Sequence, residues 1–545
     1  MSNGREPKAQ IFRRESTGLV REMNAFDVAW WGIAGTGGLY LLFYFMPYAQ
    51  YYLPGSNLAL SIALCLLVML PLYALYASLA SAMPRAGGDY VYQSRILHPA
   101  IGFAFPFSWF TVVWVCVFVA FGGYVVAALG LTPIFLLLGS LYSNSQMVAL
   151  ASYLQSSSGT FLVSVVVAVL SLVITVYPMK WWVLAQRFVL FPFTLISNFV
   201  IIYLFASSNS FYFHKMFDFW SNRMGYPDLY ERIVQSTTSI GYTVPSFSLR
   251  HTILLMAVLS IYLAWTMWSA QGLMGEVKRA NDMGRLFKSF LGAGLYLQWI
   301  GLFTPILLFQ RVVGWDFMNR LAYAYYLPQS VVPFYPTVSL LASMLTTNPV
   351  LITLSTLGIV AGGFFIAASE FVIVTRIWLA MSLDRTLPSW FGNVNPRTHT
   401  PVGPVILSMV ISVVAAYLFD YWPPFYSVIT VGSVMGPAAV VFVTSIAAIL
   451  FPKRRREIYE QAPVARYKPL GIPLIVLIGL ASALASFSVD AMYLGAPELG
   501  YNAPVPVAFT FGILLLGFLL YYVNYAYQKA KGVDITIAFK QLPPD

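Results

Sequence analysis

Twelve long apolar segments run through the chain and leave little sequence between them. They cover residues 26–48, 57–82, 100–139, 159–178, 182–207, 249–274, 285–310, 348–382, 402–419, 423–451, 470–492 and 504–527. A helix of about 20 apolar residues crosses the roughly 30 Å hydrocarbon core of a bilayer. Only 9% of the residues are charged, whereas soluble proteins usually carry about 25%. The sequence therefore predicts an all-α polytopic membrane protein with 12 transmembrane helices.

The positive charges predict how these spans are oriented. An even number of spans places both termini on one side of the membrane. If that side is the cytoplasm, the inner loops and tails hold 25 of the 31 lysine and arginine residues, as the positive-inside rule requires. The other six lie in or beside the polar segments 208–249 and 311–347, which we expect outside, with short interfacial helices. We therefore expect a cell-membrane protein with cytoplasmic N- and C-termini.

Several other classes of protein and site are disfavoured by the sequence. The net charge is +11, but the sequence contains no soluble domain long enough to present a basic face to nucleic acid. We therefore expect the lipid bilayer as a partner and no nucleic acid. Cys65 and Cys116 both lie in apolar runs and offer neither a disulfide framework nor a zinc cluster. HExxH, CxxC and Walker-type motifs are missing from the sequence. We therefore expect no enzyme, no cofactor and no metal site. The run KRRR at 453–456 could be a lipid-recognition patch, but a charged flank of a span is the favoured interpretation.

Helix-breaking residues at bilayer depth draw attention to the first span. Gly35, Thr36, Gly37 and Gly38 lie about a third of the way along it. Unwinding there would free backbone N–H groups at the start of a half-helix, where a carboxylate could bind. Close packing of helices through small residues is the alternative.

The sixth span is the possible counterpart of the first. Its centre carries Trp265, Thr266, Trp268 and Ser269, but no proline or glycine precedes Gly272. Unwinding is therefore less evident here. The two spans occupy corresponding positions if the chain contains two inverted five-helix halves, although the halves show too little similarity to demonstrate a repeat.

Three passages resemble the amino acid-polyamine-organocation (APC) superfamily of permeases. The second span ends in MPRAGGDYVYQSRILHPAIGF, and the eighth ends in TRIWLAMSLDRTLPSWFGNVNPRTHTPVGPV. The third passage is IAGTGGLY in the first span. The resemblance implies a 5+5 inverted-repeat (LeuT-like) core plus two C-terminal helices. It divides the chain into a cytoplasmic tail (1–23), a transporter core (24–451, with repeats at about 24–207 and 249–451), and spans 11–12 with a cytoplasmic tail (452–545).

The same resemblance implies a substrate site between the first and sixth spans. Amides near Thr36 and its hydroxyl would meet the substrate carboxylate, and carbonyls near Trp265 would receive the amino group. Tyr262 falls where relatives often place an aromatic lid, although an interior packing role is the more common one for tyrosine. Thr266 and Trp268 depart from the family pattern, and the tryptophans would either shrink the pocket or offer a cation–π face. The expected substrate-binding residues are Ile33, Gly35, Thr36, Gly37, Gly38, Tyr262, Trp265, Thr266, Trp268 and Ser269.

Charged residues within or at the ends of spans supply candidates for coupling and gating. Ser369 and Glu370 lie well inside the eighth span, where Glu370 could bind Na⁺ or take up H⁺, or could instead pair with Arg376. Lysine-based proton coupling is not expected, because the fifth span, RFVLFPFTLISNF, contains no lysine. Arg187, at its start, is expected to be an interface anchor. Asp27, Arg85, Asp89 and Glu276 at the cytoplasmic face could form a gate of ion pairs, or could be solvated flanks.

The sequence thus predicts a secondary active transporter for amino acids or related amines, working by alternating access with cation coupling or exchange. The alternative is a substrate-sensing or channel-like protein on the same fold.

Overall fold

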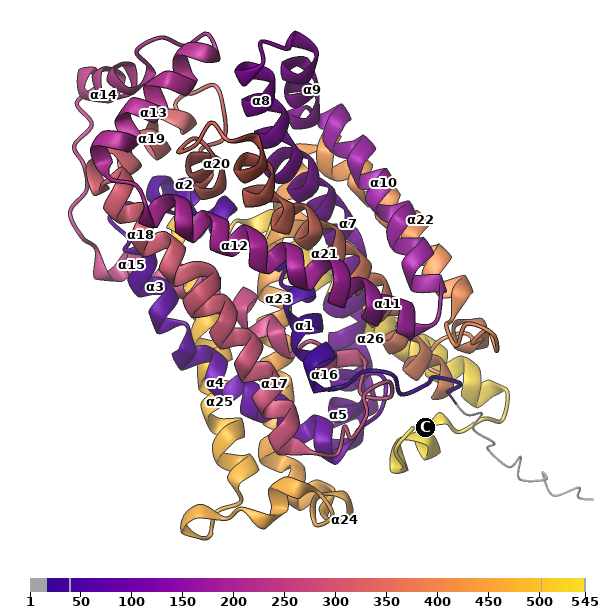
Figure 1. Cartoon of the computed structure of the whole chain (residues 1–545). Coiled ribbons are helices and arrows are strands. Elements are labelled where there is room, and N and C mark those ends of the chain that lie inside the picture. Colours follow the sequence, from indigo (N-terminus) through magenta and orange to yellow (C-terminus); the bar gives the residue numbers. More distant parts are fainter. Residues whose placement is uncertain (1–16, 39–40, 501, 544–545) are drawn as a thin grey trace, which may run out of the picture.

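The computed structural model describes residues 17–38, 41–500 and 502–543, and these form a bundle of helices (Figure 1). Apart from three isolated β-bridges, the regular structure of these residues is helical. Eleven of the described helical segments are long and apolar enough to cross a membrane: Leu58–Ala82, Pro99–Leu141, Ser157–Val176, Met179–Ala206, Leu249–Met267, Met283–Val313, Pro349–Leu383, Val402–Tyr421, Pro423–Arg454, Leu474–Gly495 and Pro504–Ala530. The predicted all-α polytopic class is confirmed.

The first predicted span consists of two short helices rather than one long helix. α1 (Ala25–Gly35) has 11 residues and α2 (Leu41–Tyr52) has 12. At 1.5 Å per residue, each covers only about 16–18 Å, which is less than the bilayer core. Predicted spans two to twelve correspond to the eleven long segments. A total of twelve therefore depends on counting α1 and α2 as one broken crossing.

Three long segments contain π-helical turns, in which the backbone ring is wider than in an α-helix. Each of α8, α12 and α18 follows such a turn and carries a proline in its first two positions. Proline lacks an N–H group and crowds the carbonyl four residues earlier, so a wider turn accommodates it. The parts of these segments are α6 (Pro99–Phe105), α7 (Trp114–Tyr124), α8 (Thr132–Leu141), α11 (Met179–Ala185), α12 (Phe191–Ala206), α17 (Met283–Leu295) and α18 (Thr304–Val313), joined by the π-helical turns Pro106–Val113, Val125–Leu131, Gln186–Leu190 and Tyr296–Phe303.

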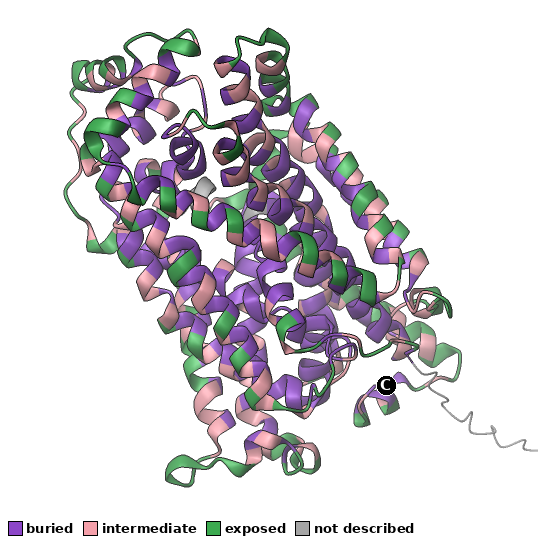
Figure 2. Cartoon of the chain, viewed as in Figure 1, coloured by how far each residue is buried: buried purple, intermediate pink, exposed green. Residues whose placement is uncertain are grey.

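The 35-residue helix α21 (Pro349–Leu383) lies in the buried centre of the bundle (Figure 2). Three of its glycines allow three neighbours to approach closely. A Cβ atom on Gly358 would lie 2.8 Å from a carbonyl oxygen of α12, and one on Gly363 would lie 2.9 Å from a carbonyl oxygen of α7. A Cβ atom on Gly362 would lie 2.1 Å from the carbonyl oxygen of Gly37, beyond the end of α1. Small residues in one helix thus set the positions of α12, α7 and the helix break.

Short helices form in both long polar segments, as expected from the sequence. α13 (Ser210–Arg223) and α14 (Leu229–Ser239) lie in the first, and α19 (Trp315–Tyr326) and α20 (Val338–Ser343) lie in the second. All four are at the upper end of the bundle in Figure 1, beside the hairpin of α8 and α9 (Ser145–Gln155). We call this the outer end, following the predicted orientation.

The opposite end holds the described parts of both termini. The chain before α1 pairs with the segment after the sixth span through the bridge between Met23 and Val277. A second bridge joins Ala86 and Leu273. The other helices are α3 (Leu58–Leu64), α4 (Leu66–Ala82), α5 (Asp89–Ile96), α10 (Ser157–Val176), α15 (Leu249–Ala264), α16 (Ser269–Gly272), α22 (Val402–Tyr421), α23 (Pro423–Arg454), α24 (Arg456–Tyr459), α25 (Leu474–Gly495) and α26 (Pro504–Ala530), with short 3₁₀ turns at Trp265–Met267, Ser389–Gly392, Pro463–Arg466, Pro469–Gly471, Pro497–Leu499 and Ile535–Lys540.

Candidate functional site

The first half of the first span, α1, begins with a capping box and ends at a glycine turn. The Asn24 side chain accepts hydrogen bonds from the backbone N–H groups of Phe26 and Asp27, and the Asp27 carboxylate accepts one from the N–H of Asn24. At the other end, α1 stops at Gly35, and Gly37 and Gly38 have φ angles of 68° and 64°. Only glycine adopts these angles without cost. The helix break expected from the sequence is therefore present.

The backbone amides at this break are already hydrogen-bonded. Thr36 N–H donates to the carbonyl of Gly32 (3.1 Å), and Gly37 N–H donates to that of Ala34 (2.9 Å). The Thr36 hydroxyl donates to the carbonyl of Ile33 (2.8 Å), and its side chain is fully buried. The expectation that the break frees the amides of Thr36 and Gly37 is wrong for this structure, because a tight turn uses both. A carboxylate would have to replace these bonds.

The sixth span tightens where the first breaks. α15 ends at Ala264, and Trp265–Met267 form a 3₁₀ turn that leads into the short helix α16. The carbonyl of Trp265 accepts a bond from Trp268 N–H (2.9 Å) but retains a second lone pair. Thr266 is held by its hydroxyl, which donates to the Tyr73 hydroxyl of α4 (2.7 Å). The sequence did not indicate this narrowing of the helix.

The two spans touch through their backbones. A Cβ atom on Gly32 would lie 2.2 Å from the carbonyl oxygen of Thr266, and one on Gly35 would lie 3.8 Å from the Trp268 side chain. On the far side of the break, a Cβ atom on Gly38 would lie 3.8 Å from the hydroxyl oxygen of Thr194 in α12. The break is thus enclosed by the sixth span, α12 and Gly362 of α21.

The tryptophans of the sixth span pack against aromatic residues of α7. Trp268 stacks on Trp114 with ring centroids 3.6 Å apart, and it meets Trp265 edge to face with centroids 4.9 Å apart. Trp265 also meets Phe118 (5.9 Å) and Tyr262 (4.6 Å) edge to face. One face of Trp268 is therefore covered and offers no cation–π contact.

Several buried polar atoms of the sixth span and of α12 have no hydrogen-bond partner among the described residues. They include Trp268 Nε1, Ser269 Oγ, Gln271 Oε1 and Thr194 Oγ1. Trp265, Thr266, Trp268 and Ser269 are each at most 3% exposed. Buried polar groups usually have partners, so these atoms are the groups that a small polar solute could satisfy.

Glu370 is buried in α21 with neither carboxylate oxygen hydrogen-bonded within the described part of the chain. It lies near Cys116 of α7. The hydroxyl of Ser369 donates to the carbonyl of Ile366 (2.9 Å). The helix break contacts α21 at a different position, Gly362. Gly362 is eight residues, or about 12 Å along the helix, from Glu370.

The alternative pairing of Glu370 with Arg376 is wrong. Arg376 forms a two-bond ion pair with Glu276, with both distances 3.1 Å and both side chains 2% exposed. Helix geometry explains the outcome, because residues six positions apart point to different faces.

A second ion pair lies, like the Glu276–Arg376 pair, at the end of the bundle that holds the termini. Asp27 of α1 accepts two hydrogen bonds from Arg187, both 2.8 Å, at the π-helical turn before α12. Arg187, which we expected to be an interface anchor, thus joins the first and fifth spans. Two of the four gate candidates, Asp27 and Glu276, are therefore in ion pairs.

The other two gate candidates have different contacts. Asp89 is buried and accepts hydrogen bonds from the hydroxyls of Tyr76 and Thr444. Arg85 donates to the carbonyl of Pro543 (2.9 Å) in the C-terminal tail. These contacts link α5 and the segment before it to neighbouring helices and to the tail.

One buried pair was missed by the sequence analysis. Arg95 of α5 lies 2.5 Å from Asp384, the residue directly after α21, and both side chains are fully buried. The Tyr90 hydroxyl donates to the same carboxylate (2.8 Å). All three residues belong to the two long motifs quoted in the sequence analysis. Their presence in these motifs was the feature of the sequence that could have indicated the pair.

The sequence pattern of the amino acid permease family matches residues 24–528, which is nearly the whole chain. This chain belongs to the amino acid permease family. The resemblance to the APC superfamily is thereby confirmed. Membership indicates a membrane transport protein for small molecules rather than an enzyme.

Two curated relatives are similar to parts of this permease. An uncharacterized transporter from Rhizobium meliloti is 32% identical over 119 residues, which is 22% of this chain and 24% of the relative. An uncharacterized amino-acid permease from Schizosaccharomyces pombe is 25% identical over 191 residues, which is 33% of this chain and 32% of the relative. The matched segments thus span about a quarter and a third of these relatives.

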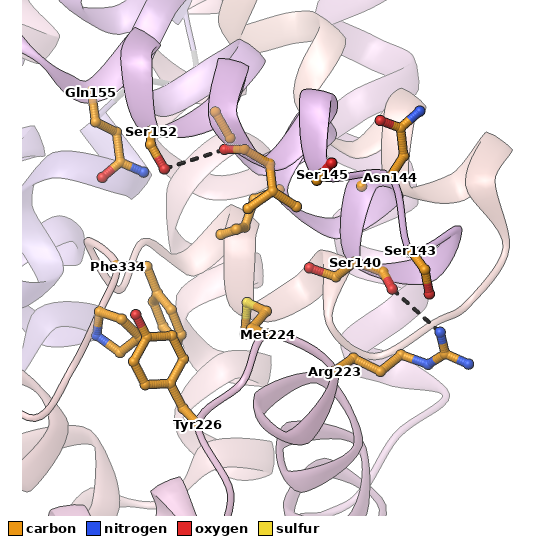
Figure 3. Close-up of a pocket in the computed structure, with 15 residues that line it drawn as sticks. Ser140, Ser143, Asn144, Ser145, Ser152, Gln155, Arg223, Met224, Tyr226 and Phe334 are labelled. Atoms are coloured by element: carbon orange, nitrogen blue, oxygen red, sulfur yellow. Dashed lines mark hydrogen bonds between the residues drawn. The ribbon is translucent and has the colours of Figure 1, made fainter.

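The permease also has a cavity of about 430 Å³ at its outer end, shown in Figure 3. Hydroxyl and amide side chains from the α8–α9 hairpin form one wall, and Arg223, Tyr226 and Phe334 form another. Arg223 is held by the carbonyls of Ser140 and Leu141. The lining contains none of the predicted substrate-binding residues, so this cavity is separate from the helix break.

Proposed function

We propose that this permease is a secondary active transporter that moves amino acids or related amines by alternating access. The observation that carries the proposal is the break between α1 and α2, which lies against the 3₁₀ turn of the sixth span. Backbone irregularity at bilayer depth occurs where protein or a cavity satisfies the exposed groups. A solute held at such a break meets two segments that can move relative to each other.

The ion pairs at the end bearing the termini support a closed inner gate. Asp27–Arg187 joins the first span to the fifth, and Glu276–Arg376 joins the sixth to the eighth. The bridge between Met23 and Val277 adds backbone bonds between the segments flanking the first and sixth spans. Because the predicted site is also buried, we assign this conformation to an occluded state. Opening toward the cytoplasm would require these pairs to separate.

Glu370 is our candidate for the coupling residue, with H⁺ as the coupling ion. An isolated carboxylate buried without partners costs several kcal/mol more than a neutral carboxylic acid. A bound proton removes that charge without requiring other ligands, whereas Na⁺ would need several oxygen atoms around it. Ser369 supports Na⁺ poorly, since its hydroxyl is bonded within its own helix.

Transport by purified protein in proteoliposomes tests the proposal directly. Labelled amino acids and amines would be supplied with and without imposed H⁺ and Na⁺ gradients. Saturable uptake, accelerated by unlabelled substrate on the opposite side, is expected of a carrier. Flux that rises linearly with concentration would indicate a channel. Ligand-induced thermal stabilisation without any flux would indicate a sensor.

A further inference from the structure

A cavity of about 720 Å³ opens at the end of the molecule that holds both termini. Four parts of the chain surround it: the turn between α5 and α6, the end of α23, the last turns of α26, and the C-terminal tail. Its lining includes three basic residues, Arg454, Arg455 and Lys540, and three tyrosines, Tyr521, Tyr522 and Tyr525. Segments more than 400 residues apart in sequence therefore build one site.

The wall of this cavity is positively charged. Arg95, Arg454, Arg455 and Lys540 line it, and no carboxylate belongs to its described lining. Asp384 pairs with Arg95, and Glu457 pairs with Arg455 (3.4 Å). The described lining thus gathers four cations, while the carboxylates that pair with two of them lie outside it.

Neutral carbonyl groups hold two of these cations in place. Arg455 donates to the carbonyls of Arg95 (2.7 Å) and Phe539, and Arg454 donates to that of Leu97 (3.0 Å). A guanidinium group has five N–H donors, so these bonds position it without neutralising it. Burial lowers the pKa of Arg455 and nearby Arg95 lowers it further, against an opposing effect of the exposed Glu457. An anion in the cavity would relieve this crowding of positive charge.

The tyrosines place the cavity at the level of the lipid headgroups. Leu515, Leu519 and Val523 on α26 are exposed apolar residues, as expected of a surface that faces lipid. Tyr522 and Tyr525 follow at the end of this band, where tyrosine rings are favoured at the membrane interface. The cavity therefore lies beside lipid, with cations at headgroup depth.

We propose that this cavity binds the phosphate headgroup of an anionic phospholipid. Arg454, Arg455 and Lys540 contact the phosphate oxygens, and the acyl chains lie along the exposed face of α26. Guanidinium groups match phosphate oxygens geometrically, and basic pockets between spans recognise lipid headgroups in this way. Since Phe539 and Lys540 belong to the C-terminal tail, the bound lipid also holds the tail against the bundle.

Thermal unfolding of the purified full-length protein in a neutral detergent tests the site. We would titrate dioctanoyl phosphatidylglycerol, with dioctanoyl phosphatidylcholine and inorganic phosphate as separate arms. The expected result is a saturable rise in Tm with phosphatidylglycerol alone. In the double variant Arg454→Gln/Lys540→Gln, the apparent affinity should fall at least about tenfold, because each lost cation contributes about 1 kcal/mol.

Lys453→Gln/Arg456→Gln is the matched control, because it removes two adjacent cations that do not line the cavity. Its affinity for phosphatidylglycerol should equal that of the unaltered protein. Equal weakening in both double variants would overturn the site in favour of general surface charge. An equal Tm rise with inorganic phosphate would overturn a lipid occupant, and the absence of any phosphatidylglycerol effect would overturn both. If the Arg454→Gln/Lys540→Gln protein fails to fold, Lys540→Gln alone must weaken binding, since Lys540 is exposed and can be changed safely.

Discussion

At the scale of single residues, Glu370 and Gly37 have features that are energetically costly in their buried surroundings. Glu370 has no hydrogen-bond partner for either carboxylate oxygen within the described chain. Gly37 has a backbone conformation that side chains disfavour, and its carbonyl lies where only a glycine at position 362 leaves room. Each feature has an energetic cost in the folded protein, so each is a place where substitution should affect transport.

Glu370→Gln should abolish the dependence of uptake on a proton gradient while leaving exchange of labelled for unlabelled substrate intact. The amide keeps the size of the side chain but cannot gain or lose a proton in the cycle. Uptake and exchange would be measured in parallel in proteoliposomes. Asp490→Asn is a matched control, because Asp490 also lies within a span, in α25. Uptake by this variant should remain dependent on the proton gradient. Gradient-driven uptake by the Glu370→Gln protein would show that this residue is structural.

Gly37→Leu should reduce uptake to background without preventing membrane insertion. A left-handed conformation costs a residue with a side chain about 1–2 kcal/mol, so the turn at the break should change. The initial uptake rate would be compared at equal reconstituted protein. Gly512→Leu is the control, since Gly512 lies in α26 with no atom within 4 Å of an added Cβ. Unchanged uptake by the Gly37→Leu protein would refute the position of the substrate site.

At the scale of helices, two ion pairs join spans at the end of the bundle that holds the termini. Asp27–Arg187 joins α1 to the start of α12, with the arginine side chain 37% exposed. Glu276–Arg376 joins the segment after α16 to α21, and both side chains are 2% exposed. The two pairs have the same bidentate geometry and both contain a buried carboxylate, but only Arg187 is partly exposed, so they should differ in their effect on stability.

Arg376→Gln should therefore lower the free energy of unfolding by about 3–5 kcal/mol, because it leaves the Glu276 carboxylate buried and unpaired. Arg187→Gln should lower it by less, about 1 kcal/mol, because Arg187 is partly exposed and the buried Asp27 carboxylate keeps its hydrogen bond from Asn24 N–H at the start of α1. Thermal unfolding of both variants in the same detergent measures the difference. An equal or reversed order of the two Tm values would contradict this account of the gate.

At the scale of the whole molecule, the C-terminal tail connects the motif after the second span with the end of α23. Arg85 donates to the carbonyl of Pro543, Arg95 to that of Gln541, and Arg455 to that of Phe539. The tail thus covers one face of the motif after the second span. These contacts join the tail, which follows α26, to the segment 85–97 and to the end of α23.

Removing residues 535–545 should expose this face. Hydrogen–deuterium exchange of the segment 85–97 should become at least several-fold faster, because arginines that now bind the tail would be hydrated. Exchange in the outer helices α13 and α14 provides an internal control and should not change. Equal exchange rates at 85–97 with and without the tail would show that the tail does not hold this segment.

The sequence by itself determined the features that depend on local chemistry. Apolar length predicted spans two to twelve, because the cost of exposing backbone to lipid is met by helix formation within each segment. The cluster at residues 35–38 predicted the helix break, since glycine's access to positive φ is a property of the residue itself. Polar composition likewise predicted the short helices of the outer end.

Only the tertiary structure decided which groups meet. Arg376 pairs with Glu276, 100 residues away, rather than with Glu370 on its own helix. Arg85 reaches a carbonyl 458 positions further along the chain. Gly362 lies against Gly37, and the basic cavity assembles from four separate segments. These partners meet only when the helices pack together, and the sequence of a single helix does not specify which helices become its neighbours. No local pattern could therefore have predicted them.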